Sequence, residues 1–269
     1  MKIAIDLDIE DNQFGRASAG YQNLSDLQFK IGELEKGLES AKKALEMAEK
    51  AKRDDYIVDS KAYLTWILHL LGKDKEVEKW FKQADELEGE ISGYRLRSIG
   101  GVFYADFLVS IQRIDEAFEL TRQNLEICQS NNFINDISRC HRLLAAIERI
   151  KKNHKDAEAH LNKSLEIAKK VGMPFLEIEA LLESARLDLD TRKYEDAIHK
   201  AQSVLNLSER TGFKLYAPEA ELILAKAYLS QGNKEKAKSF AQSAYEKANS
   251  MHYYQPKQEA TQILERIKP

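Results

Sequence analysis

Residues 32–45 read GELEKGLESAKKAL, and this stretch is either a phosphate-binding loop or the bend between two helices. A Walker-type loop needs two glycines with four residues between them, followed by lysine and then serine or threonine, because the ammonium group reaches the β- and γ-phosphates. Here Gly37 is followed by Leu38 and Glu39, so a carboxylate stands where a cation is needed. The stretch therefore predicts a bend, with Gly32 ending a helix in a left-handed conformation that costs glycine little.

Phrases of the same type recur every forty residues, and each carries small residues at matching positions. One set is Gly37, Val77, Ala117, Ala157, Ala197 and Ala237. Twelve residues earlier in each phrase lies a second set, Ser25, Thr65, Ala105, Ala145, Ala185 and Ala225. Seven residues after the first set lies a third, Ala44, Ala84, Asn124, Ser164, Val204 and Ala244. Because small side chains at a helix crossing let two axes approach closely, these sets predict tightly packed helix pairs.

Each forty-residue unit holds two stretches with apolar residues at i, i+3, i+4 and i+7, which predict two amphipathic helices joined by a polar turn. The predicted turn residues are Gly32, Gly72, Gln112, Lys152, Arg192 and Gly232. The predicted repeats are 18–57, 58–97, 98–137, 138–177, 178–217 and 218–257. Residues 1–17 are interpreted as an N-terminal remnant of a preceding second helix, or cap, and residues 258–269 as a C-terminal capping helix, with Glu265 where the repeats carry a small residue.

The composition excludes several classes of function. The net charge is −3 over 269 residues, so no global basic field recruits nucleic acid or an anionic membrane. No apolar run reaches the roughly 18 residues of a membrane-spanning helix. The two cysteines cannot build a disulfide framework, which favours a reducing, cytoplasmic setting. We therefore expect neither nucleic acid nor a membrane as a partner.

The units resemble the tetratricopeptide repeat, whose motif places small residues at its positions 8, 20 and 27 and a large apolar residue at position 7. Counting from Ser18, Val58, Ser98, Ser138, Ile178 and Pro218, the motif holds from about Ala17 to Lys247. The resemblance implies an all-α fold, a right-handed α-solenoid of about six helix-turn-helix repeats. Two features depart from the family: the period is forty rather than 34 residues, and the proline that closes many repeats is absent.

A closer resemblance is carried by YRLRSIGGVFYADFLVSIQRIDEAFE in the middle of the chain, with RASAGYQNLSDLQFKIGELEKGLESAKKALEMA before it and TGFKLYAPEAELILAKAYLSQGNKEKAKSFAQSA after it. These phrases look like the long-repeat helical arrays of STAND-class, or NACHT-class, signalling ATPases. In those proteins the array is implied to sense a ligand or partner while a separate module binds nucleotide. The Walker loop of such a module is absent from residues 1–269.

The sequence predicts no catalytic, metal or cofactor site. Cys140 and His141 are adjacent, so on a helix their side chains diverge by about 100° and do not converge on one ion. His154 and His160 are six residues apart and also lie off one face. A small buried thiol and a partly exposed imidazole explain Cys140 and His141 better, and no Gly-x-Ser-x-Gly or Gly-x-Gly-x-x-Gly motif occurs. We expect no enzyme activity.

The expected binding surface lies on the first helices of the repeats. By motif position, the candidate groove residues are Gln22, Asp26, Trp66, His69, Asp106, Arg142, Arg149, Arg186 and Lys226. Trp66 is either a partner anchor or packs against the neighbouring repeat. The arginines, with Arg139, form either a patch for an acidic or phosphorylated peptide or a solvated face balanced by Glu148, Glu179 and Glu183.

The sequence therefore predicts a non-catalytic scaffold that binds a protein or peptide, as the sensor portion of a signalling protein. The alternative is a peptide-responsive regulator that encloses a short signal peptide in its groove. A clamp for a C-terminal carboxylate is disfavoured, because such clamps use lysine and asparagine where Gln22 and Asp26 stand. The pattern does not specify an oligomeric state.

Overall fold

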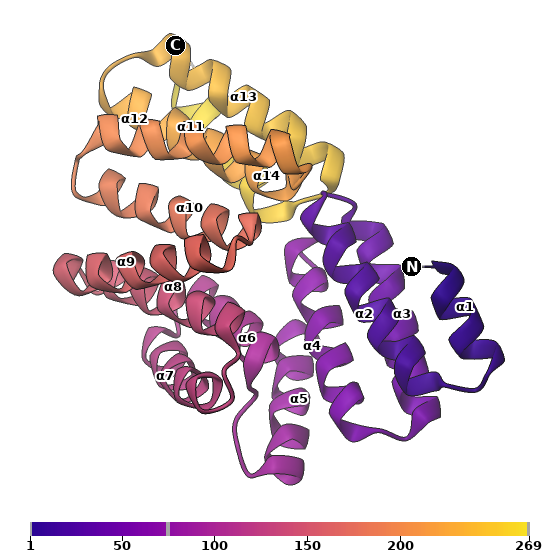
Figure 1. The fold of residues 1–269 in the computed structure, drawn as a ribbon. Helices are drawn as coiled ribbons and strands as arrows, with labels where there is room; N and C mark the ends of the chain where they lie inside the picture. The colour runs from indigo at the N-terminus through magenta and orange to yellow at the C-terminus, as the bar shows by residue number, and fades with distance from the viewer. Residues whose placement is uncertain (1, 74–75, 268–269) are drawn as a thin grey trace. The chain divides into compact units, whose positions relative to one another are not determined.

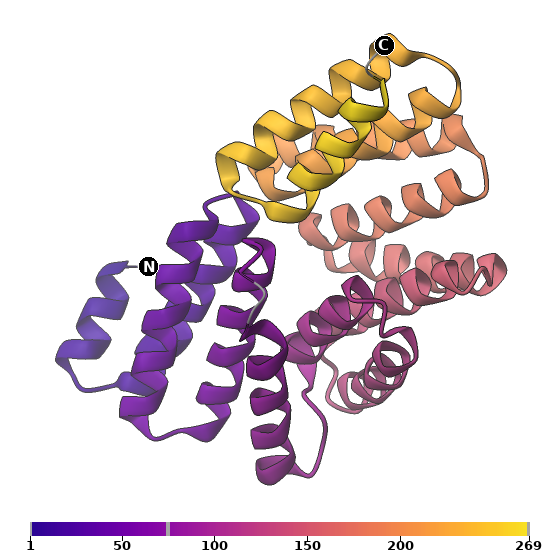
Figure 2. The same ribbon diagram turned by 180° about the vertical axis from the view of Figure 1, so that it is seen from behind.

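The computed structural model describes residues 2–73 and 76–267, and all regular structure in these residues is helical (Figure 1, and from behind in Figure 2). The α-helices are α1 (Lys2–Glu10), α2 (Phe14–Lys30), α3 (Leu34–Ala51), α4 (Asp54–Leu70), α5 (Val77–Ser92), α6 (Ser98–Ser110), α7 (Ile114–Ser130), α8 (Ile134–Ile150), α9 (His154–Val171), α10 (Pro174–Asp190), α11 (Tyr194–Thr211), α12 (Ala217–Ser230), α13 (Lys234–Met251) and α14 (Tyr254–Ile267). A short 3-10 helix, η2 (Lys214–Tyr216), precedes α12. The predicted all-α fold class is confirmed.

The chain divides into two compact units, residues 1–127 (the N-terminal unit) and residues 128–269 (the C-terminal unit). In the N-terminal unit, α1 packs on α2, and α2 with α3 and α4 with α5 form helical hairpins (Figure 1). The first helices also stack directly, α2 on α4 and α4 on α6. In the C-terminal unit, α8 with α9, α10 with α11 and α12 with α13 form hairpins. Their first helices stack in the order α8, α10, α12 and α14.

The turns follow a twenty-residue spacing, because each helix with its turn fills half a repeat. The left-handed residues on this spacing are Asn12, Gly32, Lys52, Gly72, Gln112, Asn132, Lys152, Gly172, Arg192, Gly212, Gly232 and His252. Gly32 has a φ of 86°, as predicted for the end of its helix. Each first helix of a repeat ends at such a turn. The N–H of the residue that follows the helix donates a hydrogen bond to a carbonyl oxygen of the last helical turn.

The spacing breaks once, between α5 and α6. Two residues are left-handed here, Gly93 instead of residue 92 and Ser98 at the start of α6, and residues 94–97 form a non-helical loop between them. Asp85 fixes this loop by accepting hydrogen bonds from Leu96 N at 2.6 Å and from Arg95 Nε at 2.5 Å. Gly101 makes room for it, because a Cβ there would meet the Leu96 carbonyl oxygen and lie 2.7 Å from Asn124 Nδ2.

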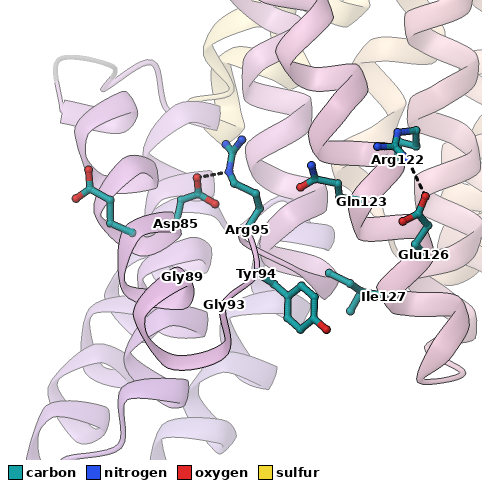
Figure 3. A pocket seen from close by; sticks show the side chains of 10 residues that line it. Asp85, Gly89, Gly93, Tyr94, Arg95, Arg122, Gln123, Glu126 and Ile127 are labelled. Atoms are coloured by element: carbon teal, nitrogen blue, oxygen red, sulfur yellow. Dashed lines mark hydrogen bonds and ion pairs between the residues drawn. The ribbon is translucent and has the colours of Figure 1, made fainter.

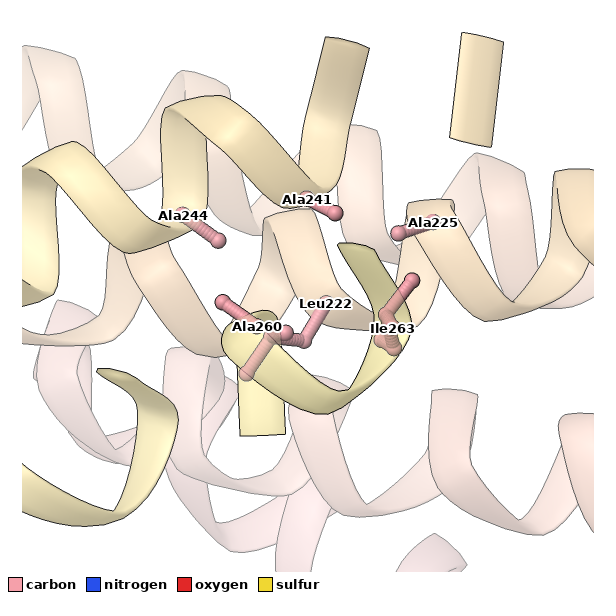
Figure 4. Packing of buried hydrophobic residues seen from close by; sticks show 6 residues of the cluster. All are labelled: Leu222, Ala225, Ala241, Ala244, Ala260 and Ile263. Carbon is pink, nitrogen blue, oxygen red and sulfur yellow. The ribbon is translucent and has the colours of Figure 1, made fainter. Parts of the chain in front are cut away.

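The core is built on the three predicted sets of small residues. All of their members are buried, and every member other than Gly37 is at most 1% exposed. Figure 4 shows the arrangement at the end of the C-terminal unit, where Ala241 and Ala244 of α13 face Ala225 of α12 and Ala260 of α14. Close approach of the helices at these positions, the physical basis of the sequence interpretation, is confirmed.

Serine hydroxyls and an asparagine join the two helices of a hairpin at positions 26 residues apart. Ser18 Oγ donates to the Ala44 carbonyl at 2.8 Å, and Ser138 Oγ donates to the Ser164 carbonyl at 3.0 Å. Between α6 and α7, Asn124 accepts from the N–H of Ser98 at 2.7 Å and donates to its carbonyl at 2.9 Å. The polar residues at the crossing positions are therefore paired, which lowers the cost of their burial.

In four of the six repeats the first helix begins four residues before the start counted from the sequence motif, whereas α6 begins at the counted start, Ser98, and α12 begins at Ala217, one residue before Pro218. The hairpins begin at Phe14, Asp54, Ile134 and Pro174, and α14 begins at Tyr254 instead of residue 258. Pro174 suits the first helical position, because the N–H that proline lacks has no partner there. Residues 249–257 (NSMHYYQPK) contribute the end of α13 and the start of α14, with only the turn at His252 and Tyr253 between them.

Candidate functional site

The nine candidate groove residues all lie on first helices. Gln22 and Asp26 lie on α2, Trp66 and His69 on α4, Asp106 on α6, Arg142 and Arg149 on α8, Arg186 on α10, and Lys226 on α12. The helices that carry them stack side by side within each unit. The structure therefore brings five of these residues together on the first helices of the N-terminal unit and four on those of the C-terminal unit.

In the N-terminal unit the first helices meet through aromatic rings. The Trp66 ring stacks on that of Phe103, with centroids 5.1 Å apart and planes 3° from parallel. His69 meets Phe107 edge-on at 5.4 Å, and Tyr63 meets Phe103 edge-on at 5.3 Å. Trp66 and His69 stay half-buried, whereas Phe103 and Phe107 are buried. Trp66 thus packs against the neighbouring repeat and keeps part of its ring in solvent.

The polar candidates of the N-terminal unit have structural partners. Gln22 is 9% exposed, and its Nε2 donates to Ser60 Oγ at 2.9 Å, joining α2 to α4. Asp26 accepts from Lys30 Nζ at 2.5 Å, and Lys30 is itself buried. Asp106 is half-buried on α6. Gln22 therefore contributes mainly to packing between repeats.

In the C-terminal unit, ion pairs join successive first helices. Arg149 Nε lies 2.6 Å from Glu183 Oε1, which connects α8 to α10, and Arg186 pairs with Glu219, which connects α10 to α12. We call the whole set the charge ladder; its members are Arg139, Arg149, Glu179, Glu183, Arg186, Glu219, Lys226 and Glu259. Tyrosine hydroxyls add to it, since Tyr216 donates to Glu179 at 3.0 Å and Tyr253 donates to Glu219 at 2.8 Å.

Glu183 is the centre of the charge ladder. Its side chain is 3% exposed and contacts both Arg149 Nε at 2.6 Å and Arg186 Nη1 at 3.0 Å. Burial alone would raise the pKa of Glu183, but the two guanidinium groups outweigh burial and hold that pKa below its usual range. Burial likewise opposes the charge on Arg186, yet Glu219 and Glu183 raise its pKa. Three of the arginines expected as a basic patch, Arg139, Arg149 and Arg186, therefore alternate with carboxylates, and Arg142 is half-buried.

A cavity of about 640 Å³ lies in the N-terminal unit where the turn spacing breaks (Figure 3). Its walls come from α5, the loop at residues 93–97 and α7. Gly89 and Gly93 leave one wall without side chains, and the exposed Tyr94 and the half-buried Ile127 lie along another. Arg122 lines the cavity while paired with Glu126 at 2.7 Å. Sequence reasoning missed this cavity, although the off-register Gly93 could have indicated an irregular loop.

The histidines are grouped differently from the sequence expectation. His141 Nδ1 of α8 lies 3.0 Å from His160 Nδ1 of α9, a pairing across the hairpin that spacing along one helix cannot reveal. Burial first, and then the charges of His160 and Lys163, lower the pKa of His141 to about 4. A hydrogen bond with Cys128, together with burial, raises the pKa of Cys140, so this thiol is a poor nucleophile. Within residues 2–73 and 76–267, no three metal-binding side chains gather.

Comparisons with known proteins concern the repeat and the fold. Models of the tetratricopeptide repeat match residues 18–50 and 102–170. A search of curated proteins with the sequence found no match. No helix in the described part of the chain is long and apolar enough to cross a membrane.

Several solved structures share the fold at low sequence identity. A Rap protein complexed with Competence and Sporulation Factor is 12% identical with a TM-score of 0.63, and the match covers 92% of this chain and 73% of that one. A Signal Transduction ATPase with Numerous Domains (STAND) protein with a tetratricopeptide repeat sensor, from Pyrococcus horikoshii, is 19% identical with a TM-score of 0.60. That match covers 97% of this chain but only 41% of the STAND protein. BtubC from P. vanneervenii is 16% identical with a TM-score of 0.53, over 86% of this chain and 94% of that one.

Proposed function

This chain is a tetratricopeptide-repeat protein, and we propose that it is a non-catalytic scaffold that binds a protein or peptide through its first helices. The observation that carries the proposal is the stacking of first helices within each unit, which lines up their outward side chains as one continuous surface. Repeat arrays of this kind use such surfaces for binding. The residues proposed to meet the partner are the candidates of the sequence analysis other than the buried Gln22, with Trp66 and Lys226 the best placed because both keep side-chain surface in solvent.

The two units offer different chemistry to a partner. Around Trp66 and His69, the N-terminal unit presents half-buried rings suited to an apolar or aromatic side chain. The charge ladder of the C-terminal unit presents charges of both signs, such as Lys226 with Glu259. A partner of the N-terminal unit therefore needs an apolar anchor, and a partner of the C-terminal unit needs charged residues.

Affinity capture from the source cells tests the proposal with matched variants. We expect Trp66→Ala and Lys226→Ala each to reduce recovery of a specific partner. The controls Lys79→Ala and Glu158→Ala change exposed residues on the second helices α5 and α9 and should leave recovery unchanged. Equal recovery by all four folded variants would contradict the assignment to the first helices.

We further propose that the chain serves as the sensor portion of a signalling protein. The fold likeness to the STAND protein with a tetratricopeptide repeat sensor supports this role, although residues 1–269 contain no Walker loop of their own. Intact-mass measurement of the native protein from cells tests the proposal. We expect a mass well above 30.8 kDa, or a stable complex with a nucleotide-binding subunit. A free protein of 30.8 kDa without such a subunit would remove the ATPase part and leave the binding scaffold.

A second candidate is a peptide-responsive regulator that encloses a short signal peptide in its groove. The fold likeness to a Rap protein complexed with Competence and Sporulation Factor favours it. Small-angle X-ray scattering with a pool of synthetic pentapeptides tests this candidate. A decrease in the radius of gyration that Trp66→Ala abolishes is the expected result, whereas unchanged scattering at saturating peptide counts against enclosure.

A further inference from the structure

The cavity between α5 and α7 lies where the repeat spacing breaks, and its irregular loop is held in place by specific contacts. Asp85 accepts a hydrogen bond from Leu96 N at 2.6 Å. At the end of the loop, the Asn124 side chain binds both backbone groups of Ser98. The cavity of about 640 Å³ is therefore bounded by a fixed loop, and its volume lies within the range of roughly 300–1,000 Å³ typical of ligand pockets.

The charged side chains that line the cavity include more carboxylates than guanidinium groups. They are Asp85, Glu86, Arg95, Arg122 and Glu126. Each arginine already lies against two carboxylates. Arg95 pairs with Asp85 at 2.5 Å and with Glu116 at 3.8 Å, and Arg122 pairs with Glu126 at 2.7 Å and with Glu119 at 3.4 Å. An anionic ligand would have to compete with these carboxylates, so the lining disfavours an anion.

Glu86 carries the surplus negative charge of the lining. It is exposed on α5, and within residues 2–73 and 76–267 it makes no hydrogen bond or ion pair. A cationic group is the ligand chemistry that suits such a carboxylate, because a hydrogen bond between two charged groups is stronger than one between neutral groups.

An aromatic ring and two bare glycines complete the cavity. Tyr94 is 55% exposed and lies with Ile127 along one wall (Figure 3). The face of an exposed ring attracts a cation, and Ile127 offers apolar surface to the methylene groups of a long side chain. The glycine wall is open, because a Cβ on Gly89 would come no closer than 3.7 Å to the Tyr94 carbonyl oxygen. A planar cation with an apolar stem therefore fits this lining.

We propose that this cavity binds an arginine side chain presented by a peptide segment of a partner protein, with the guanidinium group stacked on Tyr94 and paired with Glu86. The site lies between second helices, apart from the candidate groove residues, and does not depend on the proposed function. Arginine is preferred over lysine, because a planar guanidinium group stacks on a ring and donates to a carboxylate at the same time. The cavity is larger than one side chain, so the residues beside the arginine also contact its walls.

A nuclear magnetic resonance titration of the full-length protein tests the ligand chemistry. The probe is Nα-acetyl-arginine amide, and the matched probes are the lysine and citrulline derivatives. We expect the arginine probe to cause saturable shifts of the backbone amide resonances of Gly89, Gly93 and Tyr94. The lysine probe should bind about fivefold more weakly, because its compact ammonium group does not stack. Citrulline has nearly the shape of arginine without its charge, and it should cause no saturable shift.

Matched variants locate the binding of the arginine probe. Tyr94→Leu and Glu86→Gln should each weaken it by about fivefold, because they remove the ring and the carboxylate. The controls should leave it unchanged. Tyr254→Leu changes a tyrosine of α14 that is 47% exposed, and Glu158→Gln makes the same change in net charge on α9.

A variant that fills the cavity separates loss of binding from loss of folding. Gly89→Leu places a side chain in the open wall and should abolish binding of the arginine probe. Because leucine favours a helix more than glycine does, the variant should melt at or above the temperature of wild type. Full binding of the probe by folded Gly89→Leu would overturn the proposal.

A peptide distinguishes a protein partner from a free small molecule. A peptide with one arginine between two leucines should bind at least tenfold more tightly than the arginine probe, because its neighbours contact the remaining walls. Equal affinity of the peptide and the arginine probe would make the occupant a small cation and overturn the proposal. Equal binding of the arginine and citrulline probes would also overturn it. So would peptide binding that Trp66→Ala abolishes and Gly89→Leu retains, because the peptide would then occupy the groove.

Discussion

In the N-terminal unit, ring stacking joins α4 to α6, whereas in the C-terminal unit ion pairs join α8 to α10 and α10 to α12. The helices hold the same repeat positions in both units, with small residues at the same crossings. The repeat therefore fixes the backbone arrangement and leaves open the chemistry between neighbouring first helices. Stacked rings tolerate the loss of one atom or contact, but a buried charge depends on its specific partner.

The largest expected effect comes from removing the centre of the charge ladder. Glu183→Ala leaves Arg149 and Arg186 without their shared buried carboxylate and should destabilise the C-terminal unit by about 3–5 kcal/mol. Urea denaturation followed by circular dichroism measures the loss. Glu158→Ala, on the exposed side of α9, is the control. A loss no larger than that of the control would mean that the ladder contributes as little as surface ion pairs do.

The matching change in the N-terminal unit is Trp66→Ala, which removes the ring stacked on Phe103. Because Trp66 is only half-buried, we expect a loss of about 2–3 kcal/mol, less than for a fully buried aromatic residue. Trp66→Phe should recover more than half of it, since a smaller ring still stacks. Thermal melting compares the stability of wild type, Trp66→Ala and Trp66→Phe. A loss of stability in Trp66→Ala larger than that in Glu183→Ala would contradict the expectation that the ion pairs of the C-terminal unit are the more sensitive contacts.

Acid should act on the C-terminal unit through the histidine pair. The pKa of His141 in the folded protein is about 4, below the ordinary value near 6.5, so the folded state favours neutral imidazole. The contribution of neutral His141 to stability is therefore fully present above about pH 6.5 and is lost as the pH falls toward 4. Lys163 adds to the effect, whereas Glu148 and Asp156 oppose it at His160. We expect a decrease on the order of 2 kcal/mol across this range.

Unfolding by urea at several pH values measures this dependence. His141→Asn should flatten the profile between pH 6.5 and 4. A profile with the same slope in wild type and His141→Asn would assign the acid sensitivity to other groups, such as the carboxylates of the charge ladder.

The smallest expected effect concerns the left-handed turns, and it should be alike in both units. Gln112→Gly and Lys152→Gly replace residues with φ near 63° and 65° by glycine, which should raise stability by about 1 kcal/mol each. Differential scanning calorimetry detects such a change. Lowered melting temperatures in both variants would show that side-chain contacts at these turns outweigh the relief of backbone strain.

The repeat could be predicted from the sequence because its signal is the small volume of single side chains at fixed positions. A small residue such as Ala145 or Ala185 marks a crossing whichever partner it meets. The spacing of small residues also indicated the turns at Gly32 and Gln112. These features depend on one residue at a time, and forty-residue periodicity repeats each of them along the chain.

The partners of polar groups could not be predicted in the same way. The sequence analysis named Glu183 among three carboxylates that could balance the arginines, but Arg149 and Glu183 lie on different helices 34 residues apart, and no spacing selects that pair. Likewise, Asn124 was expected only to fit its crossing position, whereas its side chain also binds both backbone groups of Ser98. Such contacts depend on rotamers and on the offset between neighbouring helices, which a single sequence does not encode as a pattern.

The charge ladder also constrains how this protein could have changed its number of repeats. Repeat arrays gain and lose units by unequal exchange between similar segments of a gene, and each new junction brings together helices that were not adjacent before. Loss of the segment containing α10 would place Arg149 of α8 beside α12 without Glu183 and would leave Glu219 without Arg186. The order of the repeats in the C-terminal unit should therefore be difficult to rearrange, because each of these helices bears charges matched to one particular neighbour.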